Sequence, residues 1–110
     1  MLYAPACFPQ TVTNMVEAAL TCHNHSNYRM AVATYKKGWA ACRDWIEGGG
    51  ENQPSGTGLP STMSKKAIEE LELIVPCFFQ NAIGNVYESE GLDEMALGCY
   101  LDARKYVILE

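Results

Sequence analysis

Basic side chains are scarce in this sequence, and their scarcity argues against a nucleic-acid-binding protein. The chain has 8 lysines and arginines against 13 aspartates and glutamates, which gives a formal net charge of -5 at pH 7. No segment contains a dense cluster of lysine and arginine. Because an acidic surface repels phosphate groups, we expect no nucleic acid among the partners.

Long apolar runs are also missing. A membrane-spanning helix needs about 20 mainly apolar residues, and the longest candidate, Ile74 to Phe79, is short and contains Pro76. The amino-terminal residues have neither the positively charged start nor the long apolar core of a secretory signal. These absences predict a protein without a membrane span and with a cytoplasmic location.

The sequence lacks the motifs of a catalytic site. It has no glycine-rich phosphate loop, no nucleophile elbow and no Cys/His pair in an enzymatic setting. The acidic run around Glu70 is typical of a solvated helix face. The five cysteines are odd in number and widely spaced, unlike the disulfide framework of a small secreted protein. We therefore expect a non-enzymatic protein without a cofactor, whose cysteines are mostly reduced.

The chain does contain apolar side chains at helical spacing. Hydrophobic residues make up 48% of its 110 residues and charged residues 19%, which suits one compact domain. Apolar residues recur at steps of three and four between residues 12 and 23, and again between Tyr28 and Trp45. Because the polar run 24–27 separates these two stretches, the pattern predicts two helices joined by a turn.

The middle of the chain interrupts this pattern. Residues 46–62 are rich in Gly, Pro and Ser and predict a flexible loop. Residues 63–75 predict an additional helix, with capping side chains offered by Ser61 to Ser64. Pro76 follows and leaves two interpretations open: it begins a new helix, or it kinks one continuous helix.

The most specific pattern lies between Asn81 and Tyr106. Its ordered positions are Ile83, Gly84, Tyr87, Gly91, Ala96, Tyr100 and Ala103. Gly91 permits the left-handed backbone conformation that ends a helix, and Asp93 can cap the next helix. Small residues at Gly84 and Ala96 let two antiparallel helices approach closely, and tyrosines fill the remaining volume. The pattern predicts a helix hairpin.

This hairpin resembles the tetratricopeptide repeat (TPR), whose signature has a large residue, Gly and Tyr before a turn Gly, and then Ala, an aromatic residue and Ala. Gln80 stands where the family usually has Trp. A weaker copy has its corresponding positions at Ala18, Ala19, Cys22, Ser26, Ala31, Tyr35 and Gly38. The resemblance implies an all-α fold, in which antiparallel hairpins at about 12–45 and 77–110 form a short TPR-like α-solenoid with an inserted Gly/Pro-rich loop.

The resemblance also implies a scaffold that binds other proteins. Hairpins of this family stack into a concave groove that holds a partner peptide or helix. The implied contacts lie on the first helix of each hairpin, together with one tryptophan that we interpret as exposed: Asn14, Glu17, Asn81, Asn85, Glu88 and Trp45. A chaperone-type carboxylate clamp is disfavoured, because Asn81 and Glu17 stand where basic donors are needed.

Two alternatives concern the wider role of the chain. By resemblance, the chain is also a candidate structural component of a cytoskeletal or ciliary assembly. The apolar residues Val107, Ile108 and Leu109 predict self-association, docking into a larger complex, or continuation into a longer array.

A third alternative is a small zinc-binding domain. Cys22, His23 and His25 place three potential ligands within one short segment, and Cys42 could approach them across the hairpin. However, adjacent helical residues point in different directions, and the paired spacing of structural zinc sites is missing. We therefore prefer the interpretation in which Cys22 packs in the hairpin and no metal is bound.

Overall fold

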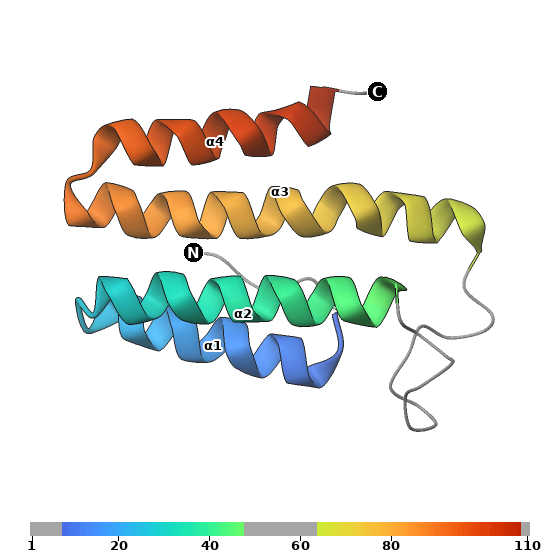
Figure 1. Ribbon diagram of the computed structural model, residues 1–110, viewed down its shortest axis with the longest axis horizontal. Coiled ribbons are helices and arrows are strands. Elements are labelled where there is room, and N and C mark those ends of the chain that lie inside the picture. The colour runs from blue at the N-terminus through green and yellow to red at the C-terminus, as the bar shows by residue number, and fades with distance from the viewer. Residues whose placement is uncertain (1–7, 48–63, 109–110) are drawn as a thin grey trace.

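Four helices make up the described part of the chain. The computed structural model describes residues 8–47 and 64–108, of which the last two are described in backbone only. The helices are α1 (Gln10–Asn24), α2 (Tyr28–Glu47), α3 (Lys65–Glu90) and α4 (Asp93–Ile108). Each packs on the next one along the chain, and successive helices run in opposite directions (Figure 1). The all-α prediction is therefore confirmed for these residues.

The first hairpin follows the apolar spacing of the sequence. α1 begins directly after Pro9, which has an extended conformation with φ -65° and ψ 154°, and it buries Val12, Val16 and Ala19. α2 buries a matching stripe that consists of Ala31, Tyr35, Gly38, Cys42 and Trp45. α2 also includes Ile46 and Glu47, so the helix ends two residues later than the sequence predicted. Residues 48–62, which make up the rest of the predicted loop, lie outside the described residues.

α3 is one continuous helix of 26 residues with Pro76 inside it. The alternative in which Pro76 begins a new helix is wrong, and so is the predicted boundary between 63–75 and 77–110. Proline removes one helical hydrogen bond at a cost of about 3 kcal/mol. Val75 and Phe79, on either side of it, are 1% and 0% exposed, and burial of such side chains contributes about 1.5–3 kcal/mol each. Packing therefore offsets the local penalty.

The amino-terminal end of α3 confirms the capping prediction. Ser64 precedes the helix in an extended conformation, and its Oγ accepts a hydrogen bond of 3.1 Å from the backbone N–H of Ala67. Such a cap contributes about 1 kcal/mol, because it satisfies a donor that has no partner within the helix. The additional helix predicted at 63–75 is thus the first part of α3.

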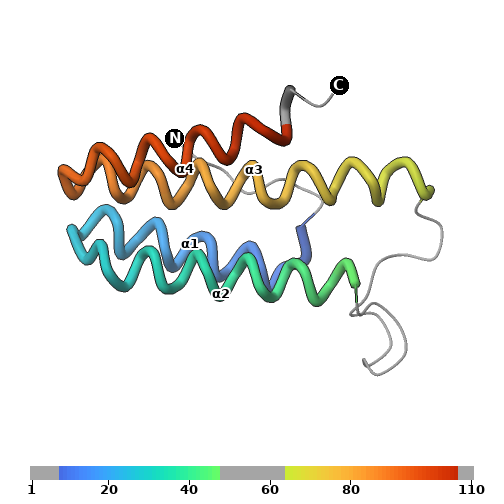
Figure 2. The backbone as a smooth tube through the Cα atoms, turned by 45° about the horizontal axis from the view of Figure 1, so that its top comes forward, coloured from blue at the N-terminus to red at the C-terminus, as the bar shows by residue number. Residues whose placement is uncertain are grey.

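Aromatic rings join the two hairpins around Phe79. Trp39 of α2 is stacked on Phe79 with ring centroids 6.1 Å apart, and Phe8 is stacked on it at 6.0 Å. Phe78 meets the same ring edge to face at 5.1 Å. Figure 2 shows the two hairpins as neighbouring pairs of tubes, with α3 beside the first pair. The core therefore runs from the segment before α1 through α2 to the middle of α3.

Candidate functional site

The α3–α4 contact depends on a missing side chain at Gly84. A Cβ atom at this position would lie 2.7 Å from Cε1 and 3.0 Å from Cδ1 of Tyr100. Ala96 and Ala103 on α4 are 3% and 2% exposed. Small residues on both helices thus allow the close approach that the sequence predicted, and the ring of Tyr100 occupies the space over Gly84.

The two hairpins turn in the same way. Gly91 has φ 85° and Ser26 has φ 61°, so both lie in the left-handed region. In the second turn the N–H of Gly91 donates to the carbonyl of Glu88, and the N–H of Leu92 to that of Tyr87. The first turn repeats both bonds at corresponding positions, from Ser26 to His23 and from Asn27 to Cys22. The weaker sequence copy is therefore matched by a repeated turn geometry.

This correspondence shows that equivalent faces of α1 and α3 differ in character. The α3 face that carries Phe79 and Ala82 is part of the core, and both residues are 0% exposed. The corresponding positions on α1 are Asn14 and Glu17, which are exposed. The amide of Gln10 donates to Oδ1 of Asn14 at 2.8 Å. α1 therefore presents a polar face where α3 presents an apolar one.

The proposed groove residues do not occupy equivalent positions in the two hairpins. Asn81 and Asn85 are half-buried, and Glu88 is exposed. Asn85 faces α4, because the hydroxyl of Tyr100 donates to its Oδ1 at 2.6 Å. Burial raises the pKa of Tyr100, and the nearby charge of Glu88 raises it further. Asn85 thus has a packing role within the second hairpin, which no sequence pattern indicated.

Asn81 also has a partner within its own helix. Its side-chain amide contacts Sγ of Cys77 at 3.7 Å. Asn14, Glu17 and Glu88 remain the predicted contact residues that are exposed to solvent.

The predicted site also includes Trp45 and the apolar residues at 107–109. Trp45 is 7% exposed and belongs to the core, so its interpretation as an exposed contact is wrong. Its position continues the buried stripe of α2, and helical periodicity alone places it with Cys42 rather than with solvent. The side chains of Val107 and Ile108, and all of Leu109, lie outside the described residues.

Exposed apolar side chains gather on α4. Leu97 is 57% exposed and Leu101 is 49% exposed, and they lie one helical turn apart. Leu92, directly before the helix, is 40% exposed, and Met95 near its start is 48% exposed. Leu97 corresponds, through the repeated turn, to Val32 of α2, which packs against the core. The surface formed by Leu97 and Leu101, here called the α4 face, is therefore apolar and uncovered.

The histidines of the zinc alternative make other contacts. Nε2 of His23 lies 2.7 Å from Oγ of Ser89 and links the carboxyl-terminal ends of α1 and α3. Nδ1 of His25 donates to the carbonyl of Thr21 at 2.8 Å. Within residues 8–47 and 64–108, no three His, Cys, Asp or Glu side chains are placed so that they could hold one metal ion.

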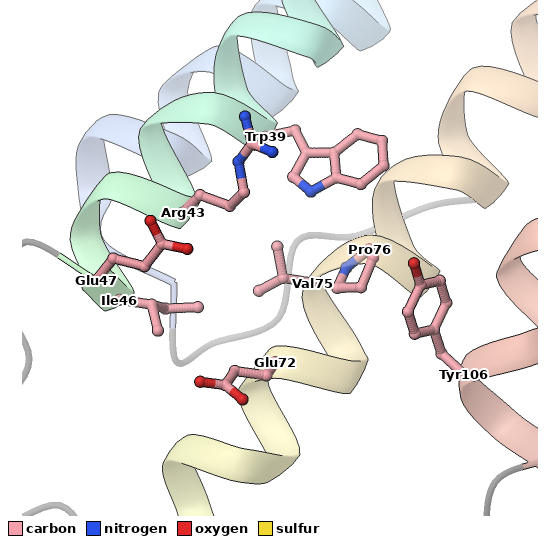
Figure 3. A pocket seen from close by; sticks show the side chains of 8 residues that line it. All are labelled: Trp39, Arg43, Ile46, Glu47, Glu72, Val75, Pro76 and Tyr106. Carbon is pink, nitrogen blue, oxygen red and sulfur yellow. The ribbon is translucent and has the colours of Figure 1, made fainter.

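A cavity of about 300 Å³ opens where α2, α3 and α4 meet. Figure 3 shows α2 on one side, the middle of α3 below and α4 on the other side. The lining residues are Trp39, Arg43, Ile46, Glu47, Glu72, Val75, Pro76 and Tyr106. Its size lies at the lower end of the roughly 300–1,000 Å³ of small-molecule sites, which suits a single side chain better than a large ligand. Sequence reasoning missed this site because its residues come from three helices.

The cavity combines apolar walls with charged groups. Trp39, Val75, Pro76 and Tyr106 supply most of the walls, while Glu47 and Glu72 contribute carboxylates from α2 and α3. Within the described part of the chain, the one ion pair joins Lys105 to Asp102. Glu47 and Glu72 are exposed, and neither has an ion-pair partner among the described residues.

Comparison with known proteins gives no relative from which a function could be transferred. No protein-family model, no curated protein and no solved structure matches the chain. Among the described helices, none is both long and apolar enough to cross a membrane.

Proposed function

We propose that the chain is a non-enzymatic protein–protein interaction module, built from two TPR-like hairpins, that binds a helix or peptide of a partner protein. The observation that carries this proposal is the exposed apolar α4 face. In α2, Val32, which corresponds to Leu97, packs against the core to which α3 contributes, while Lys36, which corresponds to Leu101, is exposed. A partner helix with an apolar stripe would pack on Leu97 and Leu101 of α4 as α3 packs on α2.

The polar face of α1 argues against a head-to-tail contact between two copies of the chain. Asn14 and Glu17 occupy the positions that Phe79 and Ala82 occupy on α3, so α1 has no apolar stripe with which to cover the α4 face of a second copy. A partner with its own apolar helix therefore fits better than a head-to-tail copy. Asn14, Glu17 and Glu88 remain the proposed polar contacts of a groove on the first helices.

Affinity capture with matched variants tests this proposal. The full chain is compared with Leu97→Gln/Leu101→Gln, which removes the α4 face, and with Asn14→Ala/Glu17→Ala, which alters the groove. Met30→Gln is the control, because Met30 is equally apolar and 50% exposed on α2. We expect the leucine variant to lose a partner that the control retains. Equal recovery with all three variants, or no specific partner at all, would contradict the proposal.

A further inference from the structure

We propose that the cavity between α2, α3 and α4 binds the side chain of a lysine or arginine from a partner protein. This inference rests on the proposed interaction function and names the chemistry of one contact within it. Three features support it: the apolar walls, the unpaired carboxylates at the rim, and the polarity of the backbone around them.

The walls suit the aliphatic stem of a long basic side chain. Trp39, Val75 and Pro76 line the cavity from α2 and α3, and Tyr106 lines the side formed by α4. Trp39 is held in place because its ring is stacked on Phe79 with an interplanar angle of 3°. Lysine and arginine bury their methylene groups along such surfaces and keep the charged end at the rim. Aromatic rings also attract cations.

The rim supplies acceptors for the charged end. Glu47 and Glu72 approach the cavity from different helices, and neither forms an ion pair with a described residue. Arg43 also lines the cavity and offsets one of the two negative charges, so the lining keeps a net negative charge. Within a chain of net charge -5, this arrangement favours a cation over an anion.

The backbones of α2 and α3 add partial negative charge near the cavity. α2 ends at Glu47 with no basic residue in its last turn, so no described side chain of that turn offsets the negative end of its dipole at the rim. On α3, Pro76 has no N–H with which to donate to the carbonyl of Glu72, four residues earlier. A donor-rich ammonium or guanidinium group is therefore the complementary ligand.

A peptide panel tests the proposal on the full chain. The probes are acetylated and amidated pentapeptides Ala-Leu-X-Leu-Ala, in which X is lysine, arginine, norleucine or glutamate. Binding is measured by calorimetry and by the NMR shift of the Trp39 indole N–H. We expect the lysine and arginine peptides to bind about tenfold more tightly than the norleucine peptide, which is the factor for one charge-assisted hydrogen bond at the lower end of its range.

Paired variants assign this preference to the rim. In Glu47→Gln/Glu72→Gln, the affinity for the lysine peptide should lie within about twofold of the affinity for the norleucine peptide. Glu70→Gln, an exposed change on α3 outside the cavity, should leave the tenfold difference in affinity in place. The proposal is overturned if norleucine or glutamate binds as tightly as lysine, if no probe shifts Trp39, or if the double variant keeps the preference.

The same variants separate this proposal from the proposed function. If Glu47→Gln/Glu72→Gln still captures the partner that Leu97→Gln/Leu101→Gln loses, and no peptide discriminates by charge, the cavity inference fails and the interaction function stands. If both variants and the control capture no partner, the proposed interaction function is contradicted.

Discussion

Two glycines of the second hairpin differ in what surrounds their α-carbons. At Gly84 a Cβ atom would lie 2.7 Å from a ring carbon of Tyr100 and 3.2 Å from Cβ of Cys99, and at Gly98 it would meet nothing within 4 Å. The first position therefore has a packing requirement for glycine. The second has only the lower helix propensity of glycine, with no contact that requires it.

Alanine at these two positions should have opposite effects. We expect Gly84→Ala to lower the free energy of unfolding by about 1–3 kcal/mol through overpacking, and Gly98→Ala to raise it by about 0.5–1 kcal/mol through helix propensity. Urea unfolding followed by circular dichroism measures both. If Gly84→Ala were as stable as Gly98→Ala, the close α3–α4 approach would be contradicted.

Tyr35 links burial to the stability of the chain at alkaline pH. Its side chain is 1% exposed, and burial raises its pKa above the ordinary value of 10.0. A raised pKa in the folded state means that folding favours the protonated phenol. The resulting stability is fully present below pH about 10 and is lost as the pH rises through the folded-state pKa.

Replacing Tyr35 should weaken this alkaline effect. We expect the free energy of unfolding of the wild type to fall above pH about 10, and that of Tyr35→Phe to fall less steeply over the same range. Urea titrations at a series of pH values from about 8 to about 11 measure the two slopes. Equal slopes would show that the Tyr35 phenol does not contribute to the pH dependence.

At the scale of elements, the turns are as informative as the helices. Gly91 and Ser26 share the left-handed conformation and the same pair of hydrogen bonds, but glycine adopts this conformation without cost and serine does not. The first hairpin therefore has a local strain that the second avoids.

Substitutions at the two turns should reveal this difference. Gly91→Ala is expected to lower the melting temperature, because it introduces about 1 kcal/mol of strain, and Ser26→Gly is expected to raise it by relieving a similar strain. Scanning calorimetry compares both with the wild type. A lower melting temperature for Ser26→Gly would mean that the serine hydroxyl contributes more than the backbone strain costs.

The helices and the second turn were predictable from the sequence because they depend on local rules. Apolar spacing placed α1 and α2, and the glycine at position 91 placed the end of α3. The continuity of α3 through Pro76 was not predictable, since it depends on how both halves of the helix pack on the rest of the core. The cavity and the Tyr100–Asn85 bond were missed for the same reason, because they join different helices.

On the scale of the whole molecule, the α4 face is the surface whose burial by a second protein would contribute free energy of association. Leu97 and Leu101 are about half exposed, and full burial of a leucine contributes about 1.5–3 kcal/mol. In the absence of a partner, the α4 faces of two copies of the chain also offer a contact to each other.

We expect weak, concentration-dependent self-association that involves the α4 face. Sedimentation velocity should show an average mass that rises with the concentration of the wild type and of Met30→Gln, but not with that of Leu97→Gln/Leu101→Gln. Exposed substitutions of this kind should change the free energy of unfolding by less than about 0.5 kcal/mol. A wild type that stays strictly monomeric would contradict the expectation.

The stacking of Trp39 and Phe8 on Phe79 also determines how the protein unfolds. Helices that pack mainly on their sequence neighbours can melt one hairpin at a time, as in linear repeat arrays. Phe79 is 0% exposed and stacks on Trp39 of α2 and on Phe8, which precedes α1, so the second hairpin cannot separate without exposing all three rings. Together with the other α3 residues of the shared core, these rings thereby couple the two hairpins into one cooperative folding unit.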